Sequence, residues 1–150
     1  MRYSTGLANK TWGTTGFAGA LNAGVIEIYP GTMPADADDA ISGTMIVRIT
    51  KASGAWTAGT STNGLVMDTA LNVNSIHAGD TWSGVAAASN TAGFAVFKGN
   101  AADNNGSSTT LARALLTVGV GTGEVQLSHI DITSGETVTV TSATLTQPRV

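Results

Sequence analysis

The sequence predicts an all-β protein, namely a single antiparallel β-sandwich or jelly-roll-like domain with an extended N-terminal arm and at most one short helix. Its apolar runs are short, rich in Val, Ile and Thr, and separated by clusters of Gly, Asn, Asp and Ser, as is typical of strands joined by turns. A chain of 150 residues suits one domain that buries about two thirds of its extended surface. We therefore assign residues 1–15 to the arm and residues 16–150 to the domain.

Eight apolar runs follow one another as strand candidates, and their spacing indicates a sandwich or jelly roll. They span residues 25–29, 44–51, 64–68, 80–87, 92–98, 111–118, 124–132 and 136–146. In the second run Val47 and Ile49 share one face and Arg48 takes the other, so Arg48 is expected to face solvent or a partner. The alternation slips between Leu127 and Ile130, and a β-bulge or bend would absorb that slip and curl the sheet.

Residues 16–24 favour the single short helix, because Phe17 and Leu21 fall on one helical face. Residues 2–15 are rich in glycine and lack a sustained apolar period, so we expect an extended arm that pairs with a strand edge of a neighbouring chain. The alternative is an arm that packs on its own domain. Under the first hypothesis, deletion of residues 1–14 leaves a folded monomer and weakens assembly.

The composition argues against several classes of function. Charged residues make up 11% of the chain, the net charge is −3, and the basic residues form no cluster. The sequence therefore contains no basic patch that would bind a phosphate backbone or an anionic membrane surface, and neither nucleic acid nor membrane is an expected partner. The chain has no cysteine, which excludes disulfides, thiolate metal sites and cysteine nucleophiles.

The stretch PADADDA places Asp36, Asp38 and Asp39 close together. A calcium loop that begins at Asp36 would need glycine at its sixth position and an acid at its twelfth, but Ile41 and Val47 stand there. We interpret the three aspartates as solvent-facing spacers in a turn, whose side chains bond their own backbone. A calcium site completed from elsewhere in the chain is the alternative.

The two histidines, His77 and His129, are interpreted as structural. His129 and Asp131 would share a strand face, but a catalytic triad also needs a positioned serine, and no Gly-x-Ser-x-Gly elbow occurs. Two isolated histidines make no zinc site. The glycine-rich residues 119–124 favour a hairpin turn, because no helix follows them to present its N-terminus to a phosphate. We therefore predict no catalytic residue, no metal, no cofactor and no enzymatic activity.

Three tryptophans, Trp12, Trp56 and Trp82, stand out against only three phenylalanines. Tryptophan packs in cores, anchors subunit contacts and stacks on sugars. All three roles stay open at this point.

Several short blocks, in order along most of the chain, resemble a family of small structural proteins of tailed bacteriophages and prophages. The blocks are Arg2–Leu7, Ile26–Ala35 with Ala37 and Asp38, Gly59–Leu65, Thr81–Gly84, Thr91–Phe94 and Ser107–Thr110. Each block is a common turn-and-strand phrase, and their order and spacing carry the resemblance. Members of the family resemble head decoration or cement proteins, which are β-rich, non-enzymatic and bound to the outside of the capsid.

The resemblance implies a virion protein on the capsid surface, synthesised in the cytoplasm of a bacterial host. Its partners would be the major capsid protein and further copies of itself, with a trimer as the expected oligomer. A tail, collar or fibre component that contacts host glycans is the alternative. The residues expected at the interface are Tyr3, Leu7 and Trp12 in the arm and Tyr29, Pro30 and Pro34 at the exposed turn.

Overall fold

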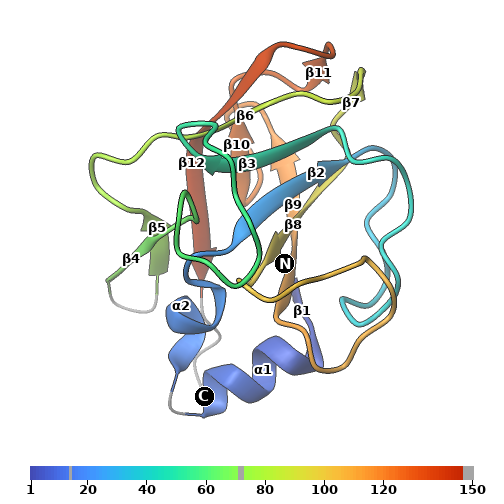
Figure 1. Cartoon of the computed structure of the whole chain (residues 1–150). Coiled ribbons are helices and arrows are strands. Elements are labelled where there is room, and N and C mark those ends of the chain that lie inside the picture. Colours follow the sequence, from blue (N-terminus) through green and yellow to red (C-terminus); the bar gives the residue numbers. More distant parts are fainter. Residues whose placement is uncertain (14, 71–72, 147–150) are drawn as a thin grey trace.

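The computed structural model describes residues 1–13, 15–70 and 73–146, so residue 14 of the predicted arm lies outside the described residues. The described elements are mostly strands (Figure 1), which confirms the β-rich class. The helices are α1 (Thr5–Trp12) and α2 (Gly16–Leu21). The strands are β1 (Arg2–Tyr3), β2 (Val25–Tyr29), β3 (Val47–Lys51), β4 (Met67–Ala70), β5 (Val73–Ile76), β6 (Trp82–Val85), β7 (Asn90–Thr91), β8 (Phe94–Lys98), β9 (Arg113–Gly119), β10 (Val125–Leu127), β11 (Asp131–Ile132) and β12 (Thr137–Thr146).

Seven strands close into a barrel where the sequence predicted a sandwich. The ring runs β9, β8, β2, β3, β6, β12 and β10, and β10 returns to β9. Every neighbouring pair is antiparallel except β10 and β9, which are parallel. The long strand β12 makes closure possible, because successive parts of it pair with β6 and β10, while its end pairs with β5 outside the ring. Sandwiches and barrels share the same alternation along each strand, and only the long-range pairing distinguishes them.

The predicted strands agree best where a strand is apolar on both faces. The run 25–29 coincides with β2, whereas the run 64–68 overlaps β4 only at its end. The short strands β1, β5 and β7 were not predicted, because partly exposed strands of this length carry little apolar pattern. The predicted phase slip lies beside a register shift between Gln126 and Leu127, where β10 pairs with β12.

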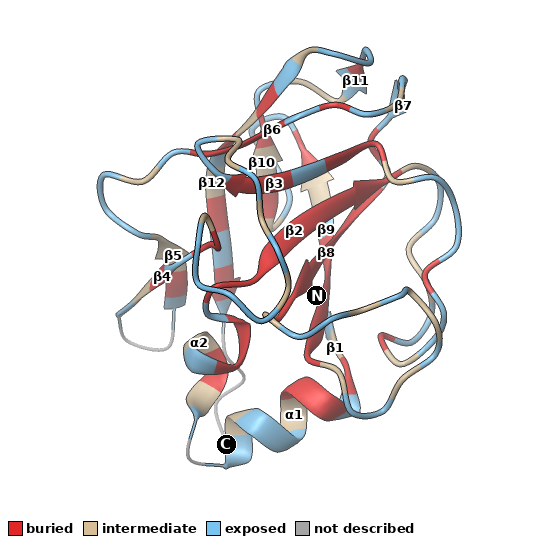
Figure 2. Cartoon of the chain, in the orientation of Figure 1, coloured by how far each residue is buried: buried red, intermediate tan, exposed pale blue. Residues whose placement is uncertain are grey.

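The barrel is filled from inside and covered on one part of its outer wall. Inside, Trp82 of β6 meets Phe97 of β8 edge to face, with ring centroids 5.9 Å apart. Outside, Tyr29 stacks on Phe94 at 5.6 Å beneath the loops that follow β2 and β8. Figure 2 shows both strands buried along their whole length. A charged residue on this outer wall is therefore removed from water, and burial of a charge requires a partner.

The N-terminal segment is not an extended arm, because it forms β1 and α1 on the barrel's own wall. The prediction of at most one helix is wrong for the same reason, although α2 lies within the predicted helical range. Ser4 caps α1 by accepting the Leu7 N–H at 3.0 Å. Gly6 lies so close to the β8–β9 loop that an added Cβ would be 2.4 Å from the Thr110 carbonyl carbon. The glycine that suggested an arm is thus a site of close helix packing.

Candidate functional site

The residues predicted at an interface do not form one surface. They are Tyr3, Leu7, Trp12, Tyr29, Pro30 and Pro34. Leu7 and Tyr29 are buried in two separate clusters, so their side chains face the protein's own core. Pro30 and Pro34 are partly buried in the loop after β2. Trp12 alone among the six is largely exposed, with 71% of its surface accessible at the end of α1.

Tyr3 connects β1 to the end of β12. Its ring meets Phe17 edge to face at 5.3 Å, and its hydroxyl donates to the Thr146 carbonyl at 2.8 Å. Burial and the nearby Glu124 carboxylate raise the pKa of Tyr3 to about 12, so the hydroxyl remains a donor at neutral pH. The contacts of Tyr3 are therefore structural.

The aspartates of PADADDA form a turn whose side chains bond its own backbone, as predicted, and Asp38 in addition contacts the start of α1. The Asp38 carboxylate accepts hydrogen bonds from the backbone N–H, at 2.9 Å, and from the hydroxyl of Thr5, at 2.5 Å. Thr5 is the first residue of α1, where a carboxylate is favoured by the helix dipole. Asp36 accepts the Asp38 N–H at 2.9 Å. Among the described residues no His, Asp and Glu side chains are grouped so as to hold a metal ion.

Each histidine lies against an acid. The His77 Nδ1 is 2.6 Å from Asp68, and the hydrogen bond and charge of Asp68 raise the pKa of His77. His129 does not meet Asp131; its Nε2 lies 2.9 Å from Glu136 and its Nδ1 lies 2.9 Å from the hydroxyl of the preceding residue. Glu136 also accepts the backbone N–H of Thr133. His129 and Glu136 thus brace the turn that leads into β12.

A group of charged and polar side chains meets on the outer wall of the barrel, and we call it the Glu27 cluster: Glu27, Tyr29, Arg48, Lys98 and Asn105. Glu27 stands at the middle of β2, with 4% of its side chain exposed, and Lys98 ends β8 with the same exposure. The Lys98 Nζ lies 2.5 Å from Glu27 Oε2. Arg48 pairs with Glu27 across β2 and β3 and donates to Oε1 at 2.8 and 3.0 Å.

The polar groups of the Glu27 cluster form a closed chain. The Tyr29 hydroxyl donates to Glu27 Oε2 at 2.6 Å and accepts from Asn105 Nδ2 at 3.0 Å. The Lys98 ammonium donates to Asn105 Oδ1 as well as to Glu27. Asn105 comes from the loop between β8 and β9 and has a left-handed backbone, with φ at 69°. Amide, ammonium, phenol and carboxylate therefore meet in one place that is largely screened from water.

The ionisation of Glu27 follows from two opposed effects. Burial pushes its pKa upward, while the Lys98 charge and the hydrogen bonds from Lys98, Tyr29 and Arg48 push it downward. The second group prevails, so the pKa of Glu27 lies below its ordinary value of 4.5. Burial and the Glu27 charge raise the pKa of Tyr29. At neutral pH the cluster thus holds a carboxylate and a protonated phenol.

A second buried ion pair holds two loops over the outer wall of the barrel. We call residues 30–46 the β2 loop and residues 99–112 the β8 loop. Arg113 is fully buried, and its guanidinium donates to both carboxylate oxygens of Asp103, at 2.6 and 2.7 Å. It also donates to the Asp39 carbonyl of the β2 loop and to the Gly106 carbonyl of the β8 loop. One side chain therefore ties both loops to the start of β9.

The sequence did not single out Glu27 and Lys98 as a pair, although a signal was present. Glu27 interrupts the apolar run VIEIY and Lys98 ends the apolar run FAVFK. Opposite charges inside two strands that are otherwise apolar indicate a buried pair, because a lone buried charge is costly. Asn105 precedes Gly106, and this pair favours a turn, but the contact of Asn105 with Lys98 depends on the path of the loop.

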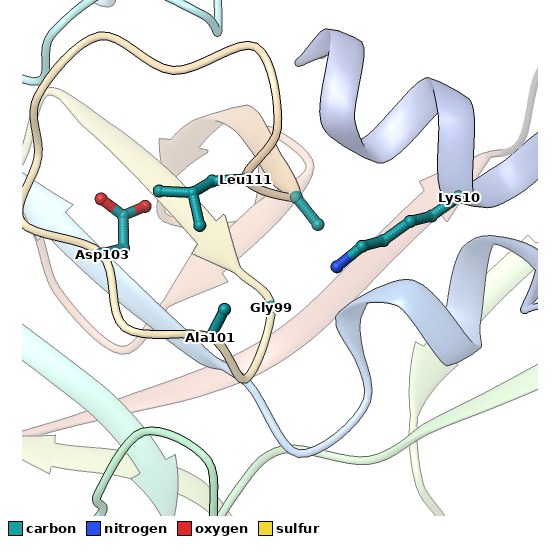
Figure 3. Close-up of a pocket in the computed structure, with 6 residues that line it drawn as sticks. Lys10, Gly99, Ala101, Asp103 and Leu111 are labelled. Carbon is teal, nitrogen blue, oxygen red and sulfur yellow. The ribbon is translucent and has the colours of Figure 1, made fainter.

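A small depression lies on the other side of the β8 loop, facing α1 (Figure 3). It is lined by Lys10, Gly99, Ala101, Asp103, Leu111 and Ala112. Figure 3 shows the Lys10 amine reaching toward the loop from α1. The Asp103 carboxylate is engaged by Arg113. Among the described residues that line it, the depression therefore offers the Lys10 amine and no convergent set of polar groups that would define a ligand.

Comparison with known proteins adds no relative. The chain matches no family model, and no curated protein or solved structure matches it. The described helices are all too short or too polar to span a bilayer.

The carboxylates in these contacts predict loss of stability in acid. Burial raises the pKa of Asp103 and of Glu124, but hydrogen bonds and adjacent cationic groups outweigh it and hold both below their ordinary values of 3.8 and 4.5, as for Glu27. A folded-state pKa below the unfolded value gives a stabilisation that is complete above the unfolded pKa and is lost as the pH falls through the folded pKa. We expect the urea midpoint to fall from pH 7 to pH 3. Equal midpoints at the two pH values would contradict this.

Proposed function

We propose that this protein is a non-enzymatic structural component of a virion, most directly a decoration or cement protein that binds the outer shell of the capsid and neighbouring copies of itself. The observation that carries the proposal is that the buried charged residues of the protein make their contacts within the protein itself. Glu27, Lys98, Asp103 and Arg113 all hold the protein's own loops against a closed barrel. Such a module contributes a stiff shape and a surface, which are what a shell-binding protein needs.

The exposed side chains support the same proposal. Trp12 stands on α1 beside the barrel with 71% of its surface accessible, and tryptophan is among the residues that contribute most to buried interfaces. The resemblance to small phage structural proteins adds the kind of partner. Many weak contacts suffice on a shell, because symmetry repeats each of them and multivalency multiplies their effect.

A tail, collar or fibre component is the second candidate, and the same Trp12 supports it, since an exposed indole also stacks on sugars. Copy number in purified virions separates the two. A shell protein is present in hundreds of copies, whereas a tail or neck component of low symmetry is present in about a dozen or fewer. Gel quantification against the major capsid protein measures this ratio, and absence of the chain from purified virions would overturn both candidates.

The role of Trp12 gives a direct prediction. The Trp12→Ala variant is expected to bind emptied capsids at least about thirtyfold more weakly, because loss of a central tryptophan costs about 2 kcal/mol or more. Its thermal midpoint should be unchanged, since the side chain is exposed. Val120→Ala removes another exposed apolar side chain, 56% accessible, and is the matched control. Equal affinity of Trp12→Ala and the native chain in a co-sedimentation titration would show that Trp12 is not an anchor.

A further inference from the structure

The Glu27 cluster contains the parts of an amide-forming reaction. Lys98 supplies an amine, Asn105 supplies a carboxamide, and Glu27 supplies a carboxylate that contacts the amine at 2.5 Å. The Lys98 and Glu27 side chains are each 4% exposed. These three residues come from β8, the β8 loop and β2, so the fold itself brings them together.

The contacts bring the Lys98 amine next to the Asn105 carboxamide. The Lys98 Nζ lies within hydrogen-bonding distance of Asn105 Oδ1, and the carboxamide carbon Cγ is one bond beyond that oxygen. When two reacting groups are held about 3 to 3.5 Å apart, the reaction between them becomes effectively unimolecular, with effective concentrations of about 10⁵ M or more. Exclusion of water also suppresses hydrolysis of the amide and strengthens the electrostatic contacts within the cluster.

We propose that Lys98 and Asn105 become joined by an intramolecular isopeptide bond, with Glu27 as the group that accepts and returns the proton. Glu27 takes a proton from the Lys98 ammonium, and the lone pair of the resulting amine forms a bond to Asn105 Cγ. The bond from Cγ to Nδ2 then breaks. The protons lost by Lys98 pass through Glu27 to Nδ2, which leaves as ammonium. The products are one secondary amide and one ammonium ion, so the reaction needs no oxidant, reductant or other reactant.

Two neighbours support this sequence of steps. The Tyr29 hydroxyl lies between Glu27 Oε2, at 2.6 Å, and the leaving nitrogen of Asn105, at 3.0 Å, so it connects the proton acceptor to the leaving group. Asn105 itself is only partly buried, which gives the released ammonium a way out. After the reaction Glu27 keeps Arg48 as its counterion.

The bond would fix the β8 loop to the end of β8. That loop also carries Asp103 and Gly106, which bind Arg113. A covalent link from Lys98 to Asn105 therefore secures the cover of the outer wall against local opening, which suits a protein that is exposed on the outside of a particle. The inference rests on the geometry of the cluster and does not depend on the virion role.

The test uses the purified full-length chain after denaturation and trypsin digestion. Linked Lys98 is no longer a trypsin site, so the expected product is one peptide of residues 52–113. Its mass should lie about 17 Da below the sequence mass, the loss of one ammonia. Fragment spectra should place the loss on Lys98 and Asn105 together. A peptide that ends at Lys98, accompanied by the remainder at full mass, overturns the proposal.

The sequence Asn105-Gly106 allows a second route to the same mass loss, because asparagine before glycine cyclises to a succinimide. A succinimide opens in mild alkali and leaves Lys98 open to trypsin, whereas an isopeptide bond survives alkali and blocks cleavage. Loss of ammonia that disappears in alkali would therefore overturn the proposal. The Lys98→Arg variant keeps the cation and removes the primary amine, so it should retain the full mass, and Lys51→Arg is the matched control that keeps the loss.

The role of Glu27 is tested by Glu27→Gln, which keeps the shape and removes the proton acceptor. Bond formation in this variant is expected to fall by at least about a hundredfold in rate, the usual effect of losing a general base. Circular dichroism identifies a variant that fails to fold, and then Tyr29→Phe, which removes only the connecting hydroxyl, provides the second measurement. Full bond formation in a folded Glu27→Gln chain would overturn the assignment of Glu27.

Discussion

The Asp103→Ala variant is expected to lose about 3 kcal/mol of unfolding free energy, because the change leaves a buried charge without its counterion. Arg113 has none of its side chain exposed, and Asp103 has 5%. In the variant the guanidinium keeps its bonds to the Asp39 and Gly106 carbonyls, which places the loss near the lower end of the range of about 3 to 5 kcal/mol measured for broken buried pairs.

The measurement is urea unfolding at pH 7, followed by tryptophan fluorescence. Asp68→Ala is the matched control, because it removes an aspartate whose pair with His77 is nearly half exposed on both sides. Exposed pairs contribute little, so the control should unfold close to the native chain. An Asp103→Ala midpoint that coincides with that of the control would show that Arg113 is not a tie between the two loops.

The sequence predicted individual strands far better than their arrangement. The run VIEIY was predicted as a strand and forms β2, because four of its five residues are apolar or β-favouring and fit a strand buried on both faces. Closure into a barrel depends on β12 pairing with both β6 and β10 and on the parallel contact between β10 and β9. Neither property is encoded in the alternation of a single strand, so a sandwich and a barrel gave the same pattern.

The candidate site was hidden for a related reason. Glu27 and Lys98 are 71 residues apart, and only the pairing of β2 with β8 brings them together. Asn105 reaches them through a loop whose left-handed residue is compatible with an Asn-Gly turn. The turn was predictable from these two residues. The direction in which the Asn105 side-chain amide points depends on Arg113, whose guanidinium donates to the Gly106 carbonyl of the same loop.

The N-terminal helix shows how local pattern misled the prediction. Residues 2–15 contain glycine and lack an apolar period, which favours an extended arm. In the structure Gly6 allows α1 to lie close to the β8 loop, and Leu7 is buried in the core. One buried apolar side chain and one N-cap therefore hold this helix in place of an amphipathic face. A serine followed three residues later by leucine gave only a weak helix signal, and tertiary packing determined the outcome.

Deletion of residues 1–14 is therefore expected to unfold the protein or leave it insoluble, in contrast to the folded monomer that an extended arm would leave. β1 pairs with β9 through Arg2 and Tyr3. The Ser4 hydroxyl donates to the Leu111 carbonyl at 2.7 Å and accepts from the Arg113 N–H at 2.9 Å. Leu7 is fully buried in the main core, and its loss alone costs about 2 to 5 kcal/mol.

Single variants separate folding from binding in this segment. Under the proposed virion role, Leu7→Ala should lower the urea midpoint strongly and reduce capsid binding only through the loss of folded protein. Trp12→Ala, on the same helix but exposed, should leave the midpoint unchanged and reduce binding of the folded chain. A truncated chain that remains monomeric, soluble and cooperatively folded would show that β1 and α1 are dispensable for the barrel, and would restore the hypothesis of an arm directed at a neighbour.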